Sequence, residues 1–65
     1  MPKVRDVERR LINEGWHIDR LGPGDHRQWK HSDKPGRRVT TDGKPNRDIP
    51  PKTYASIKRQ ADWDE

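Results

Sequence analysis

The segment WHIDRLGPGDHRQWKH (residues 16–31) decides the fold, because two runs with strand-like patterning flank the turn sequence Gly-Pro-Gly-Asp. The first run is Trp16 to Leu21, and the second is His26 to His31. Glycine and proline interrupt the chain between them, as they do in the loops of β-hairpins. The sequence therefore predicts an antiparallel hairpin whose turn delivers His26 to the first position of the second strand.

A symmetric turn fixes the expected register of this hairpin. The pairs that it predicts are Leu21 with His26, Asp19 with Gln28, Ile18 with Trp29, and His17 with Lys30. Side chains alternate between the two faces of a strand, so Trp16, Ile18 and Trp29 share the face expected to pack against helices. The opposite face, here called the open face, is expected to carry His17, Asp19, His26, Gln28 and Lys30.

A third strand is predicted over Arg37 to Thr41, after the turn sequence Asp-Lys-Pro-Gly. Its register follows from placing Val39 beside Trp29, because one apolar face of the sheet must be buried. That register brings two more residues onto the open face, Arg38 beside Lys30 and Thr40 beside Gln28.

One amphipathic helix is predicted before the three strands in the sequence and another after them. The apolar positions of the first helix are Val4, Val7, Leu11 and Ile12. The second helix opens at Ile49-Pro50-Pro51, and its apolar positions are Tyr54, Ile57 and Ala61. The predicted fold class is α+β, in the order α-β-β-β-α: a three-stranded antiparallel sheet with both helices on one face, in a single domain over residues 1–65.

Composition limits both the core and the kind of partner. The chain has 65 residues, of which only 25% are hydrophobic, so the core is small. It has no cysteine, which excludes disulfides and thiolate metal ligands. No apolar run is long enough for a transmembrane helix or a secretory signal, so a cytoplasmic location without membrane contact is expected. A formal net charge of +4 favours a polyanionic partner such as RNA.

His26 is the residue best suited to chemistry on the open face, because an ordinary imidazole exchanges a proton close to neutral pH. The alternative is a polar turn residue without a chemical role. The candidate RNA-binding side chains around it are Gln28, Lys30, Arg38 and Lys44, of which the three cations suit phosphates. His17 and His31 are not expected to converge with His26 on one ion, so we expect no metal site and no cofactor.

Several motifs along the chain stand in a distinctive order and spacing. They are Gly15-Trp16, the Gly-x-His turn at 24–26, Trp29, Arg37 to Thr40, and the closing segment IPPKTYASIKRQA. Together they resemble the HicA toxins, small mRNA interferases of type II toxin-antitoxin modules. The chain departs from the pattern at Asp25, where many members have Ser, and at Asp42 and Lys44, where many have Pro and His.

The resemblance implies a fold similar to a double-stranded-RNA-binding domain, a catalytic histidine at position 26, and neutralisation by a HicB-like antitoxin protein. The expected function is a toxin that cleaves mRNA as a metal-independent endoribonuclease. His26 would act as general base on the RNA 2′-hydroxyl, with water or Lys30 as the proton donor to the leaving oxygen. Two alternatives stay open: a non-catalytic double-stranded-RNA-binding module, and an adaptor that binds only an acidic protein.

Overall fold

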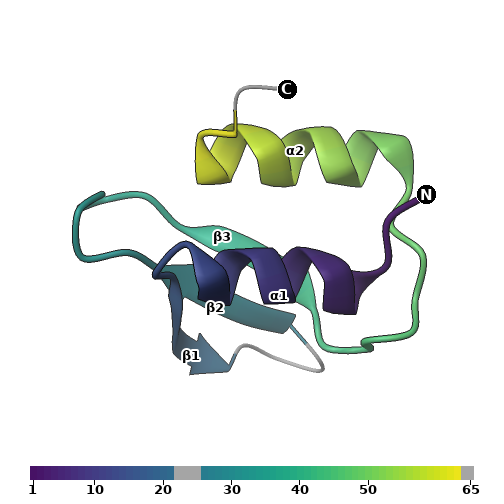
Figure 1. Cartoon of the computed structure of the whole chain (residues 1–65), viewed down its shortest axis with the longest axis horizontal. Coiled ribbons are helices and arrows are strands. Elements are labelled where there is room, and N and C mark those ends of the chain that lie inside the picture. The colour runs from purple at the N-terminus through teal and green to yellow at the C-terminus, as the bar shows by residue number, and fades with distance from the viewer. Residues whose placement is uncertain (22–25, 64–65) are drawn as a thin grey trace.

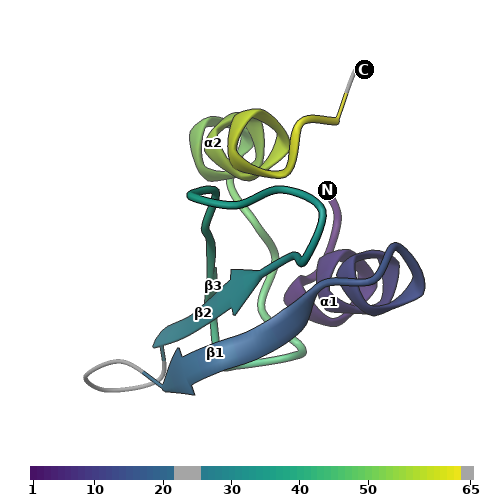
Figure 2. The same cartoon turned by 90° about the vertical axis from the view of Figure 1, so that its left-hand side faces the viewer.

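The structure is a computed structural model that describes residues 1–21 and 26–63; the predicted turn at 22–25 lies outside the described residues. The elements in chain order are α1 (Val4–Asn13), β1 (His17–Leu21), β2 (His26–Lys30), β3 (Val39–Asp42) and α2 (Pro51–Ala61) (Figure 1). The strands form an antiparallel sheet in the order β1-β2-β3. Figure 2 shows α1 and α2 on the same side of this sheet. The predicted α-β-β-β-α fold is confirmed, and neither described helix is long and apolar enough to cross a membrane.

The core lies between the helices and the covered face of the sheet. Its buried hydrophobic members among the described residues are Val4, Val7, Leu11, Trp16, Trp29, Val39, Ile49, Ile57, Ala61 and Trp63. Ile12 and Ile18 were expected on the packed side, but they are 61% and 42% exposed. The buried face of α1 includes Glu8 next to Leu11, whereas Ile12 lies outside this face.

A network of hydrogen bonds allows the carboxylate of Glu8 to lie on the buried face of α1. Glu8 Oε2 accepts a hydrogen bond from the Thr41 hydroxyl at 2.9 Å, and Thr41 Oγ1 accepts one from Trp29 Nε1 at 3.0 Å. Arg27 Nη1 donates to Glu8 Oε1 at 3.2 Å. Because buried polar groups are costly unless they are paired, this network ties α1 to β2 and β3 in one arrangement.

The connection from α1 to β1 depends on Gly15, whose φ of +95° lies in the left-handed region. A Cβ at this position would lie only 2.9 Å from His31 Nε2. His31 Nδ1 accepts from the Asp33 N–H at 3.0 Å, so its Nε2 carries the proton and donates to the Glu14 carbonyl at 2.7 Å. His31 therefore fastens the segment after β2 to the end of α1.

Trp63 closes the C-terminal part of the fold against α1. It is 8% exposed, its Nε1 donates to Glu14 Oε1 at 2.7 Å, and the Arg10 guanidinium lies 4.0 Å from its ring centroid. Partial burial acts to raise the pKa of Glu14, but hydrogen bonds from Arg10 and Trp63 outweigh it and lower that pKa. Trp63 is thus a packing residue.

The pairing of β1 with β2 contains a β-bulge that the symmetric turn did not predict. The pairs His17 with Lys30 and Ile18 with Trp29 are confirmed. The other two are wrong, because Arg20 rather than Asp19 lies opposite Gln28, and Leu21 lies opposite Arg27 rather than His26. Asp19 is the extra residue at the shift, and such bulges redirect the side chains on either side of them.

The pairing of β2 with β3 has the predicted register, with Trp29 opposite Val39 and Gln28 opposite Thr40. The strand begins two residues later than predicted, at Val39, and ends at Asp42. Arg37 lies outside the strand because its backbone N–H donates to the Lys34 carbonyl at 3.2 Å within the preceding turn. Its Nη1 donates to the Arg59 carbonyl at 3.1 Å, at the C-terminal end of α2.

Candidate functional site

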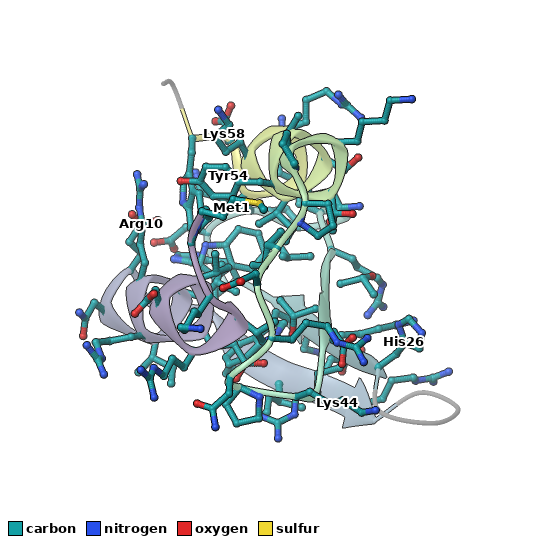
Figure 3. The ribbon with its side chains drawn as sticks, turned by 90° about the vertical axis from the view of Figure 1, so that its right-hand side faces the viewer. Met1, Arg10, His26, Lys44, Tyr54 and Lys58 are labelled. Atoms are coloured by element: carbon teal, nitrogen blue, oxygen red, sulfur yellow. The ribbon has the colours of Figure 1, made fainter. Side chains whose placement is uncertain are left out.

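His26 is the first residue of β2 and is exposed. Two residues of β2, Arg27 and Trp29, reach polar partners on the covered side of the sheet, in α1 and in Thr41. Alternation along the strand therefore turns His26, Gln28 and Lys30 to the open face. Figure 3 shows His26 and Lys44 on the side of the molecule opposite Arg10.

Asp42 stands across the ladder from His26 and organises the charges at this end of the sheet. Its Oδ2 accepts a hydrogen bond from Arg47 Nη1 at 2.7 Å, and its Oδ1 accepts one from the Lys44 N–H at 3.0 Å. The carboxylate thus holds Arg47 next to the histidine. Arg47 was missed in the sequence because it lies in a polar loop with no strand or helix pattern to place it.

Arg20 is a second cation that the sequence pattern did not place here. Simple alternation from Ile18 and His17 would put it on the covered face, but the bulge sets it opposite Gln28 on the open face, where it is exposed. Diagonal neighbours on paired strands lie about 7–8 Å apart, which is the expected spacing of Arg20 and His26. Only the structure could supply this placement, because the bulge has no signature in the sequence.

Lys30 and Arg38 form an ion-pair cluster around Asp19, here called the Asp19 cluster. Lys30 Nζ lies 3.2 Å from Asp19 Oδ1, and Arg38 Nη1 binds Asp19 Oδ2. Hydrogen bonds from Arg38 and Lys30 hold the pKa of the Asp19 carboxyl below its ordinary value. The Asp19 carboxyl is therefore ionised at neutral pH, and these ion pairs weaken as the pH falls through its lowered pKa.

The predicted site residues fall into two groups. His26 and Lys30 are four residues apart along β2, which corresponds to roughly 13 Å. Lys30 and Arg38 line one hollow, together with His17 and His31, whereas His26 lines a separate pocket with Asp42 and Arg47. Gln28 lies between the groups, and Lys44 follows the end of β3.

The histidines also separate from one another in the structure. His31 is bound to backbone groups at both ring nitrogens, and His17 lies at the Lys30 end of the sheet. Within residues 1–21 and 26–63, no group of three or more His, Cys, Asp or Glu side chains is placed to hold a metal ion.

The fold and the site define a class of protein: a small basic α+β domain that presents a histidine among cations on the open face of its sheet. Within this class, the family model for the HicA toxin of bacterial toxin-antitoxin modules matches residues 4–63. The chain belongs to the HicA toxin family, and it is a toxin whose module implies a cognate antitoxin. No curated protein and no solved structure matches the chain.

Proposed function

We propose that this toxin is an endoribonuclease that cleaves mRNA without a metal ion, with His26 as its general base. The observation that supports the proposal most is the exposed position of His26 on the open face, with Arg47 held beside it through Asp42. A base must reach the proton that it removes, and a cation is needed where negative charge develops. Both groups reach solvent at the same end of the sheet.

The proposed reaction begins when His26 removes the proton of an RNA 2′-hydroxyl. The 2′-oxygen attacks the adjacent phosphorus, the bond from phosphorus to the 5′-oxygen breaks, and the products are a 2′,3′-cyclic phosphate and a 5′-hydroxyl. Arg47 and Arg20 would stabilise the negative charge on the phosphate oxygens. Lys30 is engaged with Asp19 at the other end of β2, so water is the proposed proton donor to the leaving oxygen.

The end groups of the products test this chemistry. Cleavage of a defined mRNA is expected to continue in excess EDTA, because the nucleophile belongs to the RNA and needs no metal to activate it. Polynucleotide kinase is expected to label the new 5′ ends without prior phosphatase treatment. New 5′-phosphate ends would show metal-assisted hydrolysis instead, and RNA that is bound but left intact would favour the double-stranded-RNA-binding module.

The Asp19 cluster leads to a prediction about affinity. Asp19→Asn is expected to strengthen RNA binding, because Lys30 and Arg38 lose the carboxylate with which a phosphate has to compete. In filter binding across a salt series, the slope of log affinity against log salt should steepen by about 0.7–0.9 for each additional phosphate that the protein neutralises. Lys30→Ala and Arg38→Ala should make the slope shallower by the same amount for each phosphate that the variant leaves unneutralised.

Asp33→Asn is the matched control for Asp19→Asn, since it removes the same charge from an exposed position in the segment after β2. If both variants strengthen binding equally, net charge alone accounts for the effect and the Asp19 cluster has no specific role.

We also propose that the cognate antitoxin is HicB-like and covers the open face. His26 and the cations of this face are exposed, so a partner with acidic groups would meet a complementary potential, which speeds association and disfavours wrong partners. Binding to the folded toxin would also raise its melting temperature by mass action. In this arrangement the antitoxin silences the toxin by burying the proposed general base.

A further inference from the structure

A pocket of about 390 Å³ opens beside His26, between the outer edge of β3, the loop that follows it and the start of α2. This volume is within the range of small-molecule sites, about 300–1,000 Å³. Ile49 and Ile57 contribute to its wall, and they are 3% and 2% exposed, so the core fixes their positions. Pro50 and Thr53 line the pocket from exposed positions, which leaves it open to solvent.

The outer edge of β3 adds hydrogen-bonding groups to this apolar wall. The Thr40 N–H donates to Gln60 Oε1 at 3.1 Å, so the backbone groups of Thr40 point away from β2. Alternation along an antiparallel ladder turns the backbone groups of Asp42 the same way. Thr40 and Asp42 both line the pocket, and Thr53 lines it from α2. Gln60 takes up the Thr40 N–H, so the Thr40 carbonyl and the backbone groups of Asp42 are the polar groups that this edge offers a ligand. A flat ligand could therefore meet apolar atoms on its faces and polar groups at its edge.

The charges around the pocket favour a neutral ligand attached to an anion. Among residues 1–21 and 26–63, the two carboxylates that line it are paired, Asp42 with Arg47 at 2.7 Å and Asp48 with Lys3 at 3.1 Å. Neither carboxylate therefore gives the pocket an uncompensated negative charge. Arg47 lines the same pocket as His26. Asp42 binds its Nη1, and the guanidinium has further N–H donors that a phosphate attached to the ligand can share.

We propose that this pocket is a nucleobase subsite, which holds the base of a nucleotide next to the cleaved phosphate and so selects the RNA sequences that are cut. A nucleobase combines apolar faces with an edge of donors and acceptors, and a phosphate is joined to it through the sugar. The inference deepens the proposed function and rests on it for the role of the base in cleavage. Base binding itself can be measured without any cleavage.

The first test is an NMR titration of the labelled protein with the four nucleoside 3′-monophosphates and, separately, with inorganic phosphate. The monophosphates are expected to shift the amide signals of Ile49, Thr53 and Ile57, by amounts that differ among the four bases. Inorganic phosphate should leave these signals in place. Shifts that inorganic phosphate reproduces, shifts confined to the Asp19 cluster, or the absence of shifts would overturn the inference.

The second test fills the pocket. Thr53→Trp is expected to lower kcat/KM for a preferred RNA site about tenfold or more, the equivalent of 1.4 kcal/mol, and to change the ranking of cut sites. Ala55→Trp places the same ring at an exposed position of α2 outside the pocket, and it should keep the original sites and rate. Thr53→Val, which keeps the side-chain shape, should alter the ranking of sites through loss of the hydroxyl alone. Melting curves confirm that each variant is folded.

The outcomes separate the two proposals. If His26→Ala is inactive while Thr53→Trp and Thr53→Val cut the same sites at the original rate, the subsite is overturned and the ribonuclease stands. If His26→Ala cleaves RNA at the original rate, the ribonuclease mechanism fails, and the NMR titration alone decides whether the pocket binds bases.

Discussion

His26→Ala is expected to abolish measurable RNA cleavage, with a fall in rate of about 10²–10⁴-fold, while the melting temperature stays close to that of the original chain. The loss follows because His26 is the proposed base on the 2′-hydroxyl, and neither of the other two histidines can replace it. Both ring nitrogens of His31 are bound to backbone groups, and His17 lies at the end of β1 that is opposite Lys30, away from His26. Stability should be retained because the side chain is exposed and packs into nothing in the core.

His31→Ala is the matched control for this experiment. It removes an imidazole that joins the Glu14 carbonyl to the Asp33 N–H, so it should lower the free energy of unfolding by about 1–3 kcal/mol. At a temperature where that variant is folded, RNA cleavage should persist. Circular dichroism melting and a timed digestion of labelled mRNA provide both readouts. Full cleavage by His26→Ala would remove the residue from the mechanism, and a large loss of stability would make it a structural turn residue.

The position of His26 could be predicted from the sequence because local rules determine it. Two strand-like runs on either side of a Gly-Pro turn can pair in few ways, and the alternation set by Trp29 puts His26 on the open face. The pairing of β2 with β3 was likewise predictable, because Val39 had to join Trp29 in the core.

Other features depend on contacts between residues far apart in the chain, which no local pattern contains. The bulge at Asp19 brings Arg20 to the open face and sets Asp19 among Lys30 and Arg38, so the register of a symmetric turn was wrong there. The position of Arg47 is set by its hydrogen bond to Asp42, and it lies in a loop whose sequence has no hydrophobic periodicity. Helical spacing alone also favoured Ile12 over Glu8 for the core, since a carboxylate is buried only where distant partners satisfy it.

Glu8→Ala is expected to lower the free energy of unfolding by about 2–3 kcal/mol. The change leaves the buried Thr41 hydroxyl without its acceptor and the Arg27 guanidinium without its carboxylate. Arg27 is 35% exposed and can be rehydrated, which keeps the loss below that of a fully buried ion pair. A chain of 65 residues has a total stability of roughly 3–10 kcal/mol. The loss is therefore a substantial part of the total, and the melting temperature of the variant should fall by about 4–8 °C for each kcal/mol lost.

Urea unfolding of a double-mutant cycle shows whether the network itself carries this stability. Thr41→Val keeps the side-chain shape but removes the hydroxyl that binds Trp29 Nε1 and Glu8 Oε2. The two losses of stability should therefore not be additive. Residues in one network typically couple by about 0.5–3 kcal/mol. Arg9→Ala, an exposed change on the same helix, should shift the free energy by less than about 0.5 kcal/mol. Additive losses in the cycle would mean that Glu8 contributes through packing and through Arg27, and not through its bond to Thr41. Coupled losses would mean that the carboxylate fixes α1 against β2 and β3, and with them the strand that begins at His26.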